Sequence, residues 1–481
     1  MRSSGSRVLV GVLLAVPALL AGVLPATAAP PVAEAPPQPA EFVSRPDLSP
    51  PVVRIDRGPG RTEPGQIFVA PHGTDTHSGP MILDETGQPV WFQPVGDGDR
   101  HFTMDFKAQR YQGEPVLTWW QGAPHPGYGS GEYVITNQAY EQVATVRAGN
   151  GLEADLHEMV ITPRDTALIT AYHTVQLDRP VVEGVVQEID IATGEVLFDW
   201  RSLDHVAPAE STAPVPEDPA APHDYIHLNS ITEDAAGNLL ISARHTDALY
   251  QVDRGSGEII WRMGGTNSDF AVDPEAAFAR QHDAGWLPDG RMSLFDNAAS
   301  EPGPISRGLV LDVDQQARTV GLAESYEHPG GATSVSQGNH QVLAGGNHFV
   351  GWGSVPEFTE FGPAGEVRLH GSLGDGMESY RAFKLNWSGA PTDQPAAAMR
   401  DETGGRAIYA SWNGATEVRS WRILAGQSAD GLRPVVENVP REAFETRAVL
   451  PSAEPYAAVE ALDTDGRVIG RSPVIEPSAR S

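Results

Sequence analysis

One short pattern recurs along the chain: a polar turn that contains Asp and Gly, followed by a strand of β-branched and aromatic residues. Asp and Gly suit the tight turn of a hairpin, and the residues that follow suit a pleated strand. A repeat of about 40 to 50 residues with several strands per unit restricts the chain to architectures built from repeated sheets. Clear copies occupy 84–92, 190–198 and 253–261, and weaker copies occupy 137–146, 312–320 and 362–369.

A second repeated element, strand, turn and strand, precedes three of these turns, at 161–170, 231–242 and 286–295. Two hairpins per unit, and six units between 65 and 372, favour a propeller over a sandwich of two sheets. Helical periodicity is confined to a short stretch at 273–279. The sequence therefore predicts an all-β chain with a six-bladed β-propeller over 52–390.

The pattern changes near Arg406, where alternating strands carry Trp412 and Trp421 early and Tyr456 late. This texture resembles a fibronectin type III or immunoglobulin-like β-sandwich. We expect such a sandwich over 406–477, joined to the propeller by a linker over 391–405. The module concentrates no reactive side chains, so we expect no chemistry in it.

The first 28 residues have the layout of a secretory signal, with Arg2 and Arg7 ahead of an apolar run at 8–24 and small residues at 26–28. A retained anchor is the weaker alternative, because the run is shorter than the roughly 20 residues of a membrane span and contains Pro17. We expect a secreted, extracellular protein with a signal peptide over 1–28 and a Pro-rich linker over 29–51. No membrane contact is expected after cleavage.

The chain is strongly acidic, with 33 Lys and Arg against 63 Asp and Glu and a formal net charge of -30. Such a surface repels nucleic acid and anionic lipid, so neither is expected as a partner. An anionic substrate would need a local positive site to overcome this field. The absence of cysteine excludes disulfides, thiolate metal ligands and lipid attached to cysteine.

Three histidines share one position in successive repeats: His157, His227 and His282 each lie about ten to twelve residues ahead of the second strand of their hairpin. A single histidine in a β protein is more often a structural residue. Equivalent positions in a propeller converge, however, so three at one phase favour a functional site at the channel. A second shared phase, just past the end of that strand, holds Tyr172-His173, Arg244-His245 and Asp296-Asn297.

Arg244 is the best candidate for a positive site beside these histidines. Its planar fork of donors fits tetrahedral oxyanions, although a structural ion pair is the alternative. The remaining histidines fall into two groups. His72 and His77 lie in a Gly-rich loop and stay undecided, and those interpreted as structural or surface residues are His101, His125, His205, His328, His340, His348 and His370.

Four local strings resemble a known family, and they occur in that family's order. They are LHE at 156–158, HLNSI at 227–231, SARH at 242–245 and QHDAGWLPDG at 281–290. These strings are similar to blocks of the bacterial PAPS-independent aryl sulfotransferases, and the resemblance spans about residues 65–390.

The resemblance implies a six-bladed propeller that moves a sulfuryl group from a phenolic sulfate ester to a phenol through a sulfohistidine. By position, His282 would be the nucleophile, with His157, His227 and Arg244 as supporting catalytic residues. His245, Asn229 and Asn297 would bind substrate. The resemblance implies no cofactor and no metal. Its partners would be a small-molecule aryl sulfate donor and a phenol acceptor, and the sequence does not give the oligomeric state.

Two departures from the family point to a divergent secreted branch whose acceptor loops differ. The chain lacks the cysteines that form a disulfide in some members, and its predicted sandwich follows the propeller instead of preceding it. A nucleotide sulfate donor is disfavoured directly, because no Gly-rich loop with Lys-Ser/Thr opens a helix.

Three alternatives remain open at the level of sequence. The Asp-x-x-Thr-Gly turns also resemble the repeats of quinone-dependent dehydrogenases, but those propellers have more blades than the six units found here. A non-catalytic propeller could bind cell-wall glycan or another protein. The histidines could also hold a metal with Asp155, Asp283 or Asp296, although no compact spacing such as His-Glu-x-x-His is present.

Overall fold

The computed structural model describes residues 40–73, 78–95, 102–298 and 305–476, which all belong to one compact unit, Pro37–Ser481. The signal predicted over 1–28 and the start of the Pro-rich linker lie outside the described residues. Within the described ranges no helix is long and apolar enough to cross a membrane. The helices there are single 3-10 turns: η1 (Ser202–Asp204), η2 (Pro208–Glu210), η3 (Arg244–Thr246) and η4 (Ala429–Gly431).

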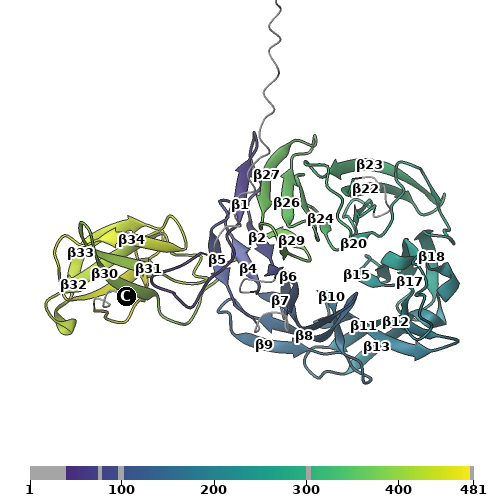
Figure 1. Cartoon of the computed structure of the whole chain (residues 1–481), viewed down its shortest axis with the longest axis horizontal. Coiled ribbons are helices and arrows are strands. Elements are labelled where there is room, and N and C mark those ends of the chain that lie inside the picture. Colours follow the sequence, from purple (N-terminus) through teal and green to yellow (C-terminus); the bar gives the residue numbers. More distant parts are fainter. Residues whose placement is uncertain (1–39, 74–77, 96–101, 299–304, 477–481) are drawn as a thin grey trace, which may run out of the picture. The chain divides into compact units, whose positions relative to one another are not determined.

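Five antiparallel meanders follow one another along the chain, and in each the hydrogen-bonded neighbours are consecutive strands (Figure 1). One residue pair, Ala154 opposite Gly131, joins the first two meanders into a single sheet. The strands are β6 (Phe102–Tyr111), β7 (Glu114–His125), β8 (Tyr128–Thr136) and β9 (Gln142–Val146); β10 (Ala154–Ile161), β11 (Thr166–Gln176), β12 (Pro180–Asp190) and β13 (Val196–Arg201); β15 (Leu228–Glu233), β16 (Leu239–Ala243), β17 (Ala248–Val252) and β18 (Ile259–Gly264); β20 (His282–Trp286), β21 (Met292–Asp296), β22 (Arg307–Asp314) and β23 (Thr319–Glu327); and β24 (Asn339–Val342), β25 (His348–Gly351), β26 (Glu357–Phe361) and β27 (Val367–Ser372). Flanking strands are β14 (His223–Asp224) on β12, β19 (Ala271–Val272) on β23 and β1 (Arg54–Arg57) on β27.

A further sheet combines strands from both ends of this region. β29 (Ala382–Leu385) pairs with β2 (Gln66–Val69), and β4 (Met81–Leu83) and β5 (Pro89–Phe92) complete the sheet in that order. The register places Gln66 opposite Leu385. Because this sheet needs a strand from each end, it joins the start of the region to its end.

The first strands of these sheets contact one another in sequence: β6 contacts β10, then β15, β20 and β24 follow, and β29 contacts both β24 and β6. Figure 1 shows these strands nearest the centre and the later strands of each meander farther out. The chain is therefore all-β and propeller-like, and equivalent positions on its first strands lie close together.

The repeated turns form as their residues predict. Asp84 Oδ1 accepts hydrogen bonds from the amides of Thr86 (2.8 Å) and Gln88 (3.0 Å), and Asp253 Oδ1 accepts one from Ser256 N (2.7 Å). Gly87 closes the first turn at φ 81°, a left-handed conformation that costs glycine little. Each Asp thus satisfies backbone donors that the adjoining strands leave unpaired.

Residues from about 396 onward form two more sheets. β30 (Ala396–Glu402), β31 (Gly405–Ser411) and β34 (Glu445–Val449) make one of them; β33 (Arg433–Pro440), β32 (Ser420–Gly426), β35 (Tyr456–Leu462) and β36 (Val468–Arg471) make the other. Side chains from both sheets, including Ile408, Trp421 and Val459, share one apolar core.

Three local predictions need correction. The predicted linker 391–405 contains β30, which pairs with β31 along its length. Its Ala-rich sequence lacks the alternation of apolar and polar residues by which a strand is recognised. The second half of the 29–51 linker is packed: Leu48 is buried, and Ser44 N donates to Glu445 Oε2. The helical pattern at 273–279 follows β19 as a turn, in which Ala276 N donates to Asp273 O.

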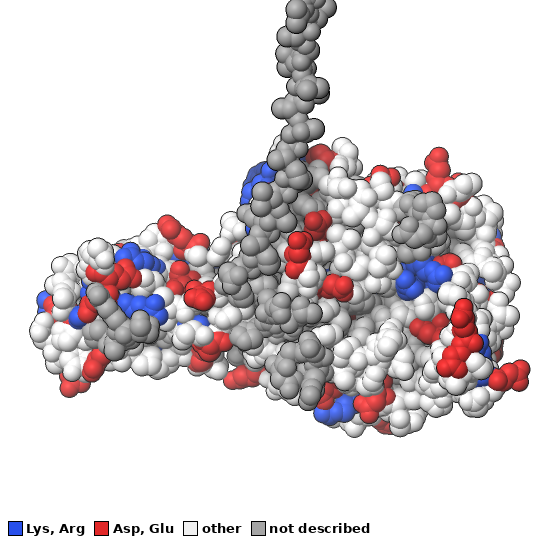
Figure 2. All heavy atoms as spheres, in the orientation of Figure 1, with Lys and Arg blue, Asp and Glu red and all other residues white. Residues whose placement is uncertain are grey.

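Acidic side chains are scattered over the face of the molecule in Figure 2, and basic side chains form smaller groups among them. The visible part of this face therefore carries no extended basic patch.

A fully buried ion pair connects the sheet that joins both ends to β26 of the last meander. Lys384 Nζ, on β29, lies 2.7 Å from Glu360 Oε2, and neither side chain is exposed. Glu360 also accepts hydrogen bonds from Glu63 N and Asn347 Nδ2, both at 2.7 Å. The carboxylate stays buried if the lysine is removed, and an uncompensated buried charge is costly.

We expect Lys384→Met to lower the free energy of unfolding by about 3–5 kcal/mol, because Glu360 would lose its buried counterion. Urea unfolding measures this, with Arg467→Met as the control. Arg467 and Asp465 form an exposed pair, worth about 1 kcal/mol or less. Equal losses in the two variants would contradict the role of the buried pair.

Candidate active site

Three histidines from three different sheets line one cavity of about 280 Å³. His157 lies in the middle of β10, His227 directly precedes β15, and His282 opens β20. All three side chains are buried. The structure therefore brings together the three histidines that share a phase in the sequence. The other described lining residues are His72, Phe102, Met104, Pro124, His125, Gly127, Tyr128, Leu156, Ser336, Gln337, Glu378 and Tyr380.

Irregular strand pairing turns these side chains into the cavity. The register with the second strand shifts between Ala154 and Met159 in β10, and between His282 and Gly285 in β20. His227 has a φ of 52°, which is uncommon for a residue with a side chain. Bulges of this kind re-aim side chains and are frequent beside active sites.

Each histidine is held through Nδ1, which leaves Nε2 for the cavity. His157 Nδ1 lies 2.6 Å from Asp155 Oδ2, and His227 Nδ1 lies 2.6 Å from Asp224 Oδ2. His282 Nδ1 lies 2.7 Å from Asn297 Oδ1. Two of the rings are therefore backed by a carboxylate, and the third is backed by a neutral amide.

The surroundings of His282 define its tautomer. Its Nδ1 also lies 3.1 Å from Arg280 O, so both neighbours of Nδ1 are acceptors and the proton resides there. Its Nε2 accepts a hydrogen bond from Gln337 N at 3.2 Å. Nε2 therefore carries the lone pair, and the 3.2 Å hydrogen bond from Gln337 N has to open before this nitrogen can attack an electrophile.

Burial keeps two of these rings neutral. Burial lowers the pKa of His282 well below its ordinary value, and the nearby positive charge of Arg244 lowers it further. Burial lowers the pKa of His227 to about 4, although the attraction of Asp224 opposes this shift. Burial acts against ionisation of Asp224, but His227 and His245 outweigh it and hold the pKa of this carboxyl below its usual range.

Arg244 supplies a cation beside this group. It lies in η3, directly after β16, and its Nη1 donates to His245 Nε2 at 2.8 Å while Nη2 donates to Val335 O at 2.8 Å. Its Nε is buried without a hydrogen-bond partner, and no carboxylate of the described residues forms an ion pair with it. Arg244 is therefore a partly buried cation without an ion-pair partner among the described carboxylates, and it lies beside the histidines but outside the cavity lining.

His245 links Arg244 to the histidine group. Its Nδ1 donates to Asp224 O at 2.7 Å, and its ring centroid lies 4.6 Å from that of His227. It does not line the cavity itself. Its position suits it to orient Arg244 and His227 more than to contact a small substrate.

The predicted substrate contacts of Asn229 and Asn297 are not supported by their positions. Both side chains are fully buried and lie outside the cavity lining. Asn229 Nδ2 donates to Gln281 O at 2.7 Å, and Asn297 holds the ring of His282. Both asparagines therefore position the backbone or the catalytic ring instead of contacting a substrate in the cavity.

Several cavity residues escaped the sequence interpretation. His125 was interpreted as structural or surface, yet it lines the cavity, as does the undecided His72. Tyr380, Gln337 and Glu378 carried no repeat signal, because they lie in the segments that lead into the last strands. Tyr172, from the predicted second phase, lies outside the cavity lining: its hydroxyl donates to Leu228 O at 2.7 Å, and its ring centroid lies 6.0 Å from that of His157.

A buried ionic group lies directly behind the cavity. Arg381 Nη1 is 2.9 Å from Asp105 Oδ1, and its Nη2 is 2.9 Å from Glu158 Oε2 and 3.6 Å from Asp283 Oδ1. Lys107 contacts both Asp105 and Glu158. Each of four cavity residues is followed in sequence by a member of this group, in the pairs Met104-Asp105, His157-Glu158, His282-Asp283 and Tyr380-Arg381.

A metal site was one alternative from the sequence, but the residues that could form one in the structure differ from those considered there. Asp224, His227 and His245 offer ligand atoms within 4.8 Å of one another. Of the carboxylates considered from sequence, Asp155 binds His157, Asp283 faces Arg381 and Asp296 pairs with Arg307 at 3.0 Å. The arginine that donates to His245 Nε2 adds a positive charge there, which disfavours a cation.

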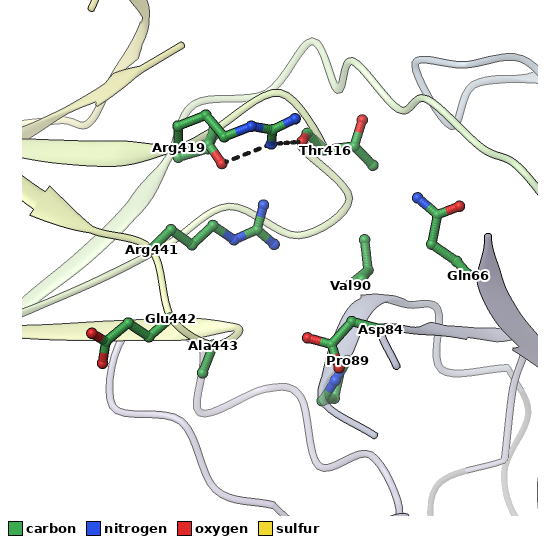
Figure 3. A pocket seen from close by; sticks show the side chains of 10 residues that line it. Gln66, Asp84, Pro89, Val90, Thr416, Arg419, Arg441, Glu442 and Ala443 are labelled. Atoms are coloured by element: carbon green, nitrogen blue, oxygen red, sulfur yellow. Dashed lines mark hydrogen bonds between the residues drawn. The ribbon is translucent and has the colours of Figure 1, made fainter. Parts of the chain in front are cut away.

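Another cavity, of about 250 Å³, lies elsewhere (Figure 3). Arg419 and Arg441 line it, and they donate to the carbonyls of Thr416 (2.7 Å) and Ala415 (2.6 Å). None of its lining residues is a histidine. The histidine-lined cavity is therefore the candidate active site.

Fold and site together define a class: an all-β, propeller-like protein with a cavity lined by histidines and backed by an arginine. Within this class, residues 107–374 match the model of the Arylsulfotransferase (ASST) family. This match covers more than half of the 481 residues. The chain belongs to the arylsulfotransferase family.

No curated protein matches the chain. Similar solved structures include a protein of unknown function from Bacteroides caccae, with 14% identity and a TM-score of 0.42 over 66% of this chain and 98% of that one. A Lactobacillus plantarum protein has 14% identity and a TM-score of 0.38 over 80% and 99%. A catalytically inactive virginiamycin B lyase from Staphylococcus aureus has 9% identity and a TM-score of 0.32 over 78% and 94%.

We expect His282 and His227 to be neutral at about pH 7, with the proton on Nδ1, because burial lowers the pKa of both rings. Nitrogen-15 NMR of histidine-labelled protein reads the tautomer directly, with His282→Gln and His227→Gln for assignment. His173, with a half-exposed side chain, serves as a control ring. An imidazolium signal for His282 at this pH would contradict the assignment.

Proposed function

We propose that this protein transfers a sulfuryl group from an aryl sulfate to a phenol through a covalent intermediate on His282, without a nucleotide sulfate. The observation that carries the proposal is the environment of His282: Nδ1 is protonated and bound to Asn297, and Nε2 faces a cavity shared with two carboxylate-backed histidines. Membership of the arylsulfotransferase family supports the substrate class.

In the first half-reaction, His282 Nε2 attacks the sulfur of the aryl sulfate. The N–S bond forms as the S–O bond to the ring breaks, and the electron pair of that bond leaves with the phenolate. His282 keeps its Nδ1 proton, so the intermediate is a sulfated imidazolium with no net charge. The phenolate takes a proton from solvent or from a protonated histidine of the site.

In the second half-reaction, the oxygen of an acceptor phenol attacks the same sulfur. The N–S bond breaks, its electron pair returns to Nε2, and the phenolic proton passes to a neutral histidine. We assign this proton transfer to His227. The ring of His227 packs against His245, and Arg244 donates a hydrogen bond to His245. His227 would therefore lie on the side of the cation that holds the sulfuryl oxygens. His157, on the other side of His227 at 4.8 Å between ring centroids, would support the same proton.

The hydrogen-bond partner of Nδ1 differs between the nucleophile His282 and the proton-transfer residue His227, and this difference suits their two roles. A carboxylate stabilises an imidazolium, so Asp224 suits a ring that gains and loses a proton. An amide cannot accept the Nδ1 proton, so Asn297 keeps the sulfated ring cationic and therefore a good leaving group. Arg244 would offset the charge on the sulfuryl oxygens as it spreads in the transition state.

We further propose the organisation that goes with this activity. The five meanders and the joining sheet would be the six blades of a propeller over 52–390, and the two C-terminal sheets would pack as a fibronectin-like sandwich. The N-terminal segment would direct secretion. An extracellular enzyme without a nucleotide cofactor is consistent with a donor that is itself a small aryl sulfate.

Incubation of the protein with 4-nitrophenyl sulfate and phenol is expected to release nitrophenol and form phenyl sulfate. Without acceptor, the tryptic peptide 281–291, whose one histidine is His282, should gain about 80 Da, the mass of one sulfuryl group. His282→Ala should lose at least about 10³-fold in kcat, whereas the half-exposed His173→Ala serves as the matched control. Turnover that survives in His282→Ala, or an adduct elsewhere, would overturn the mechanism.

The pH dependence tests the assignment of His227. As a base it acts in its neutral form, which is lost only when the pH falls through its pKa of about 4. With 4-nitrophenyl sulfate as donor, kcat/KM for the acceptor should stay level from neutral pH to about pH 5 and then fall. An acid limb near the ordinary histidine pKa would contradict the assignment to this buried ring.

A further inference from the structure

One corner of the cavity contains a carboxylate that the proposed transfer does not use. β3 (His72–Gly73) and β28 (Met377–Glu378) form a two-stranded sheet in which His72 lies opposite Glu378. Both residues line the cavity, together with Gln337. Among the described lining residues, Glu378 is the one acidic side chain, and none is Lys or Arg.

This corner offers hydrogen-bond acceptors, and two of them, His72 Nε2 and Gln337 Oε1, accept no hydrogen bond from the described residues. His72 Nδ1 lies 3.3 Å from Ala70 O and so carries the proton, which leaves a lone pair on Nε2. That Nε2 lies 3.9 Å from Glu378 Oε2, and burial lowers the pKa of His72, so the ring does not neutralise the carboxylate. Gln337 Oε1 is buried without a hydrogen-bond partner among the described residues.

Gln337 connects this corner to the reacting atom. Its side-chain Nε2 donates to Glu378 Oε2 at 2.8 Å, and its backbone N donates to His282 Nε2 at 3.2 Å. When the oxygen of a phenol approaches His282, a substituent on its ring can therefore reach the corner formed by His72, Gln337 and Glu378. A cavity of about 280 Å³ has room for one ring with a short side chain.

We propose that His72, Gln337 and Glu378 form an ammonium subsite, which makes the enzyme selective for acceptor phenols that carry a primary amine on a short chain. The inference rests on the proposed sulfuryl transfer and names its acceptor class. An ammonium group has three N–H donors and one positive charge, which match a carboxylate oxygen and the two neighbouring lone pairs. A carboxylate on the acceptor would instead face Glu378 in a partly enclosed site and be repelled.

The test compares three acceptors of similar size at a fixed 4-nitrophenyl sulfate concentration: 4-(2-aminoethyl)phenol, 4-propylphenol and 3-(4-hydroxyphenyl)propanoate. Sulfated products are quantified by mass spectrometry. We expect kcat/KM for the amine to exceed that of the neutral phenol by about 10-fold or more, and the acid to fall below the neutral phenol. Both differences arise from one charge at one position.

Glu378→Gln preserves shape and removes the charge, so the ratio of kcat/KM between amine and neutral phenol should fall toward one. Asp375→Asn is the matched control, because it removes an exposed carboxylate three residues away that does not line the cavity. It should keep the ratio. Nitrophenol release without acceptor checks that each variant still performs the first half-reaction.

The outcomes separate this inference from the function on which it rests. Transfer to all three acceptors with equal kcat/KM would overturn the ammonium subsite and leave sulfuryl transfer intact. A preference that persists in Glu378→Gln, or that disappears equally in Asp375→Asn, would also overturn it. No nitrophenol release with any acceptor would overturn both proposals.

Discussion

The centre of this protein depends on one buried cation that contacts carboxylates from three different strands. Arg381 lies between β28 and β29 and reaches Asp105 on β6, Glu158 on β10 and Asp283 on β20. Charges removed from water are stable only if they are paired with good geometry, so each strand has to present its carboxylate at the correct depth. The side chains of Arg381 and Asp105 are both buried, and burial raises the pKa of Asp105 to about 6 despite its two cationic partners.

Each of the cavity residues Met104, His157, His282 and Tyr380 directly precedes a member of this ionic group. The pairing of β10 and β20 is irregular here, and Asp283 has a φ of 54°, so the regular alternation of side chains along a strand is interrupted. The contacts of Glu158 and Asp283 with Arg381 hold the chain beside His157 and His282. An expensive buried network thus serves to hold the reacting groups in register, which is the kind of support a precise site requires.

Charge is distributed unevenly around the cavity. Burial lowers the pKa of His282, and the positive charge of Arg244, which lies outside the cavity lining, lowers it further. In the described lining itself, Glu378 and the lone pair of His72 offer hydrogen-bond acceptors, and no Lys or Arg is present.

The sequence by itself determined the local structure and the candidates. Asp and Gly turns, β-branched strands and their spacing predicted an all-β chain, because these signals come from neighbouring residues. The phase of His157, His227 and His282 predicted that they would meet. Only the tertiary structure decided the hydrogen-bond partners of these histidines, since Asn297 contacts His282 across a strand pair. It also decided that Asn229 and Asn297 lie outside the cavity lining. The pairing of His72 with Glu378 brings together the two ends of the region, and no local pattern records a contact between residues so distant in sequence.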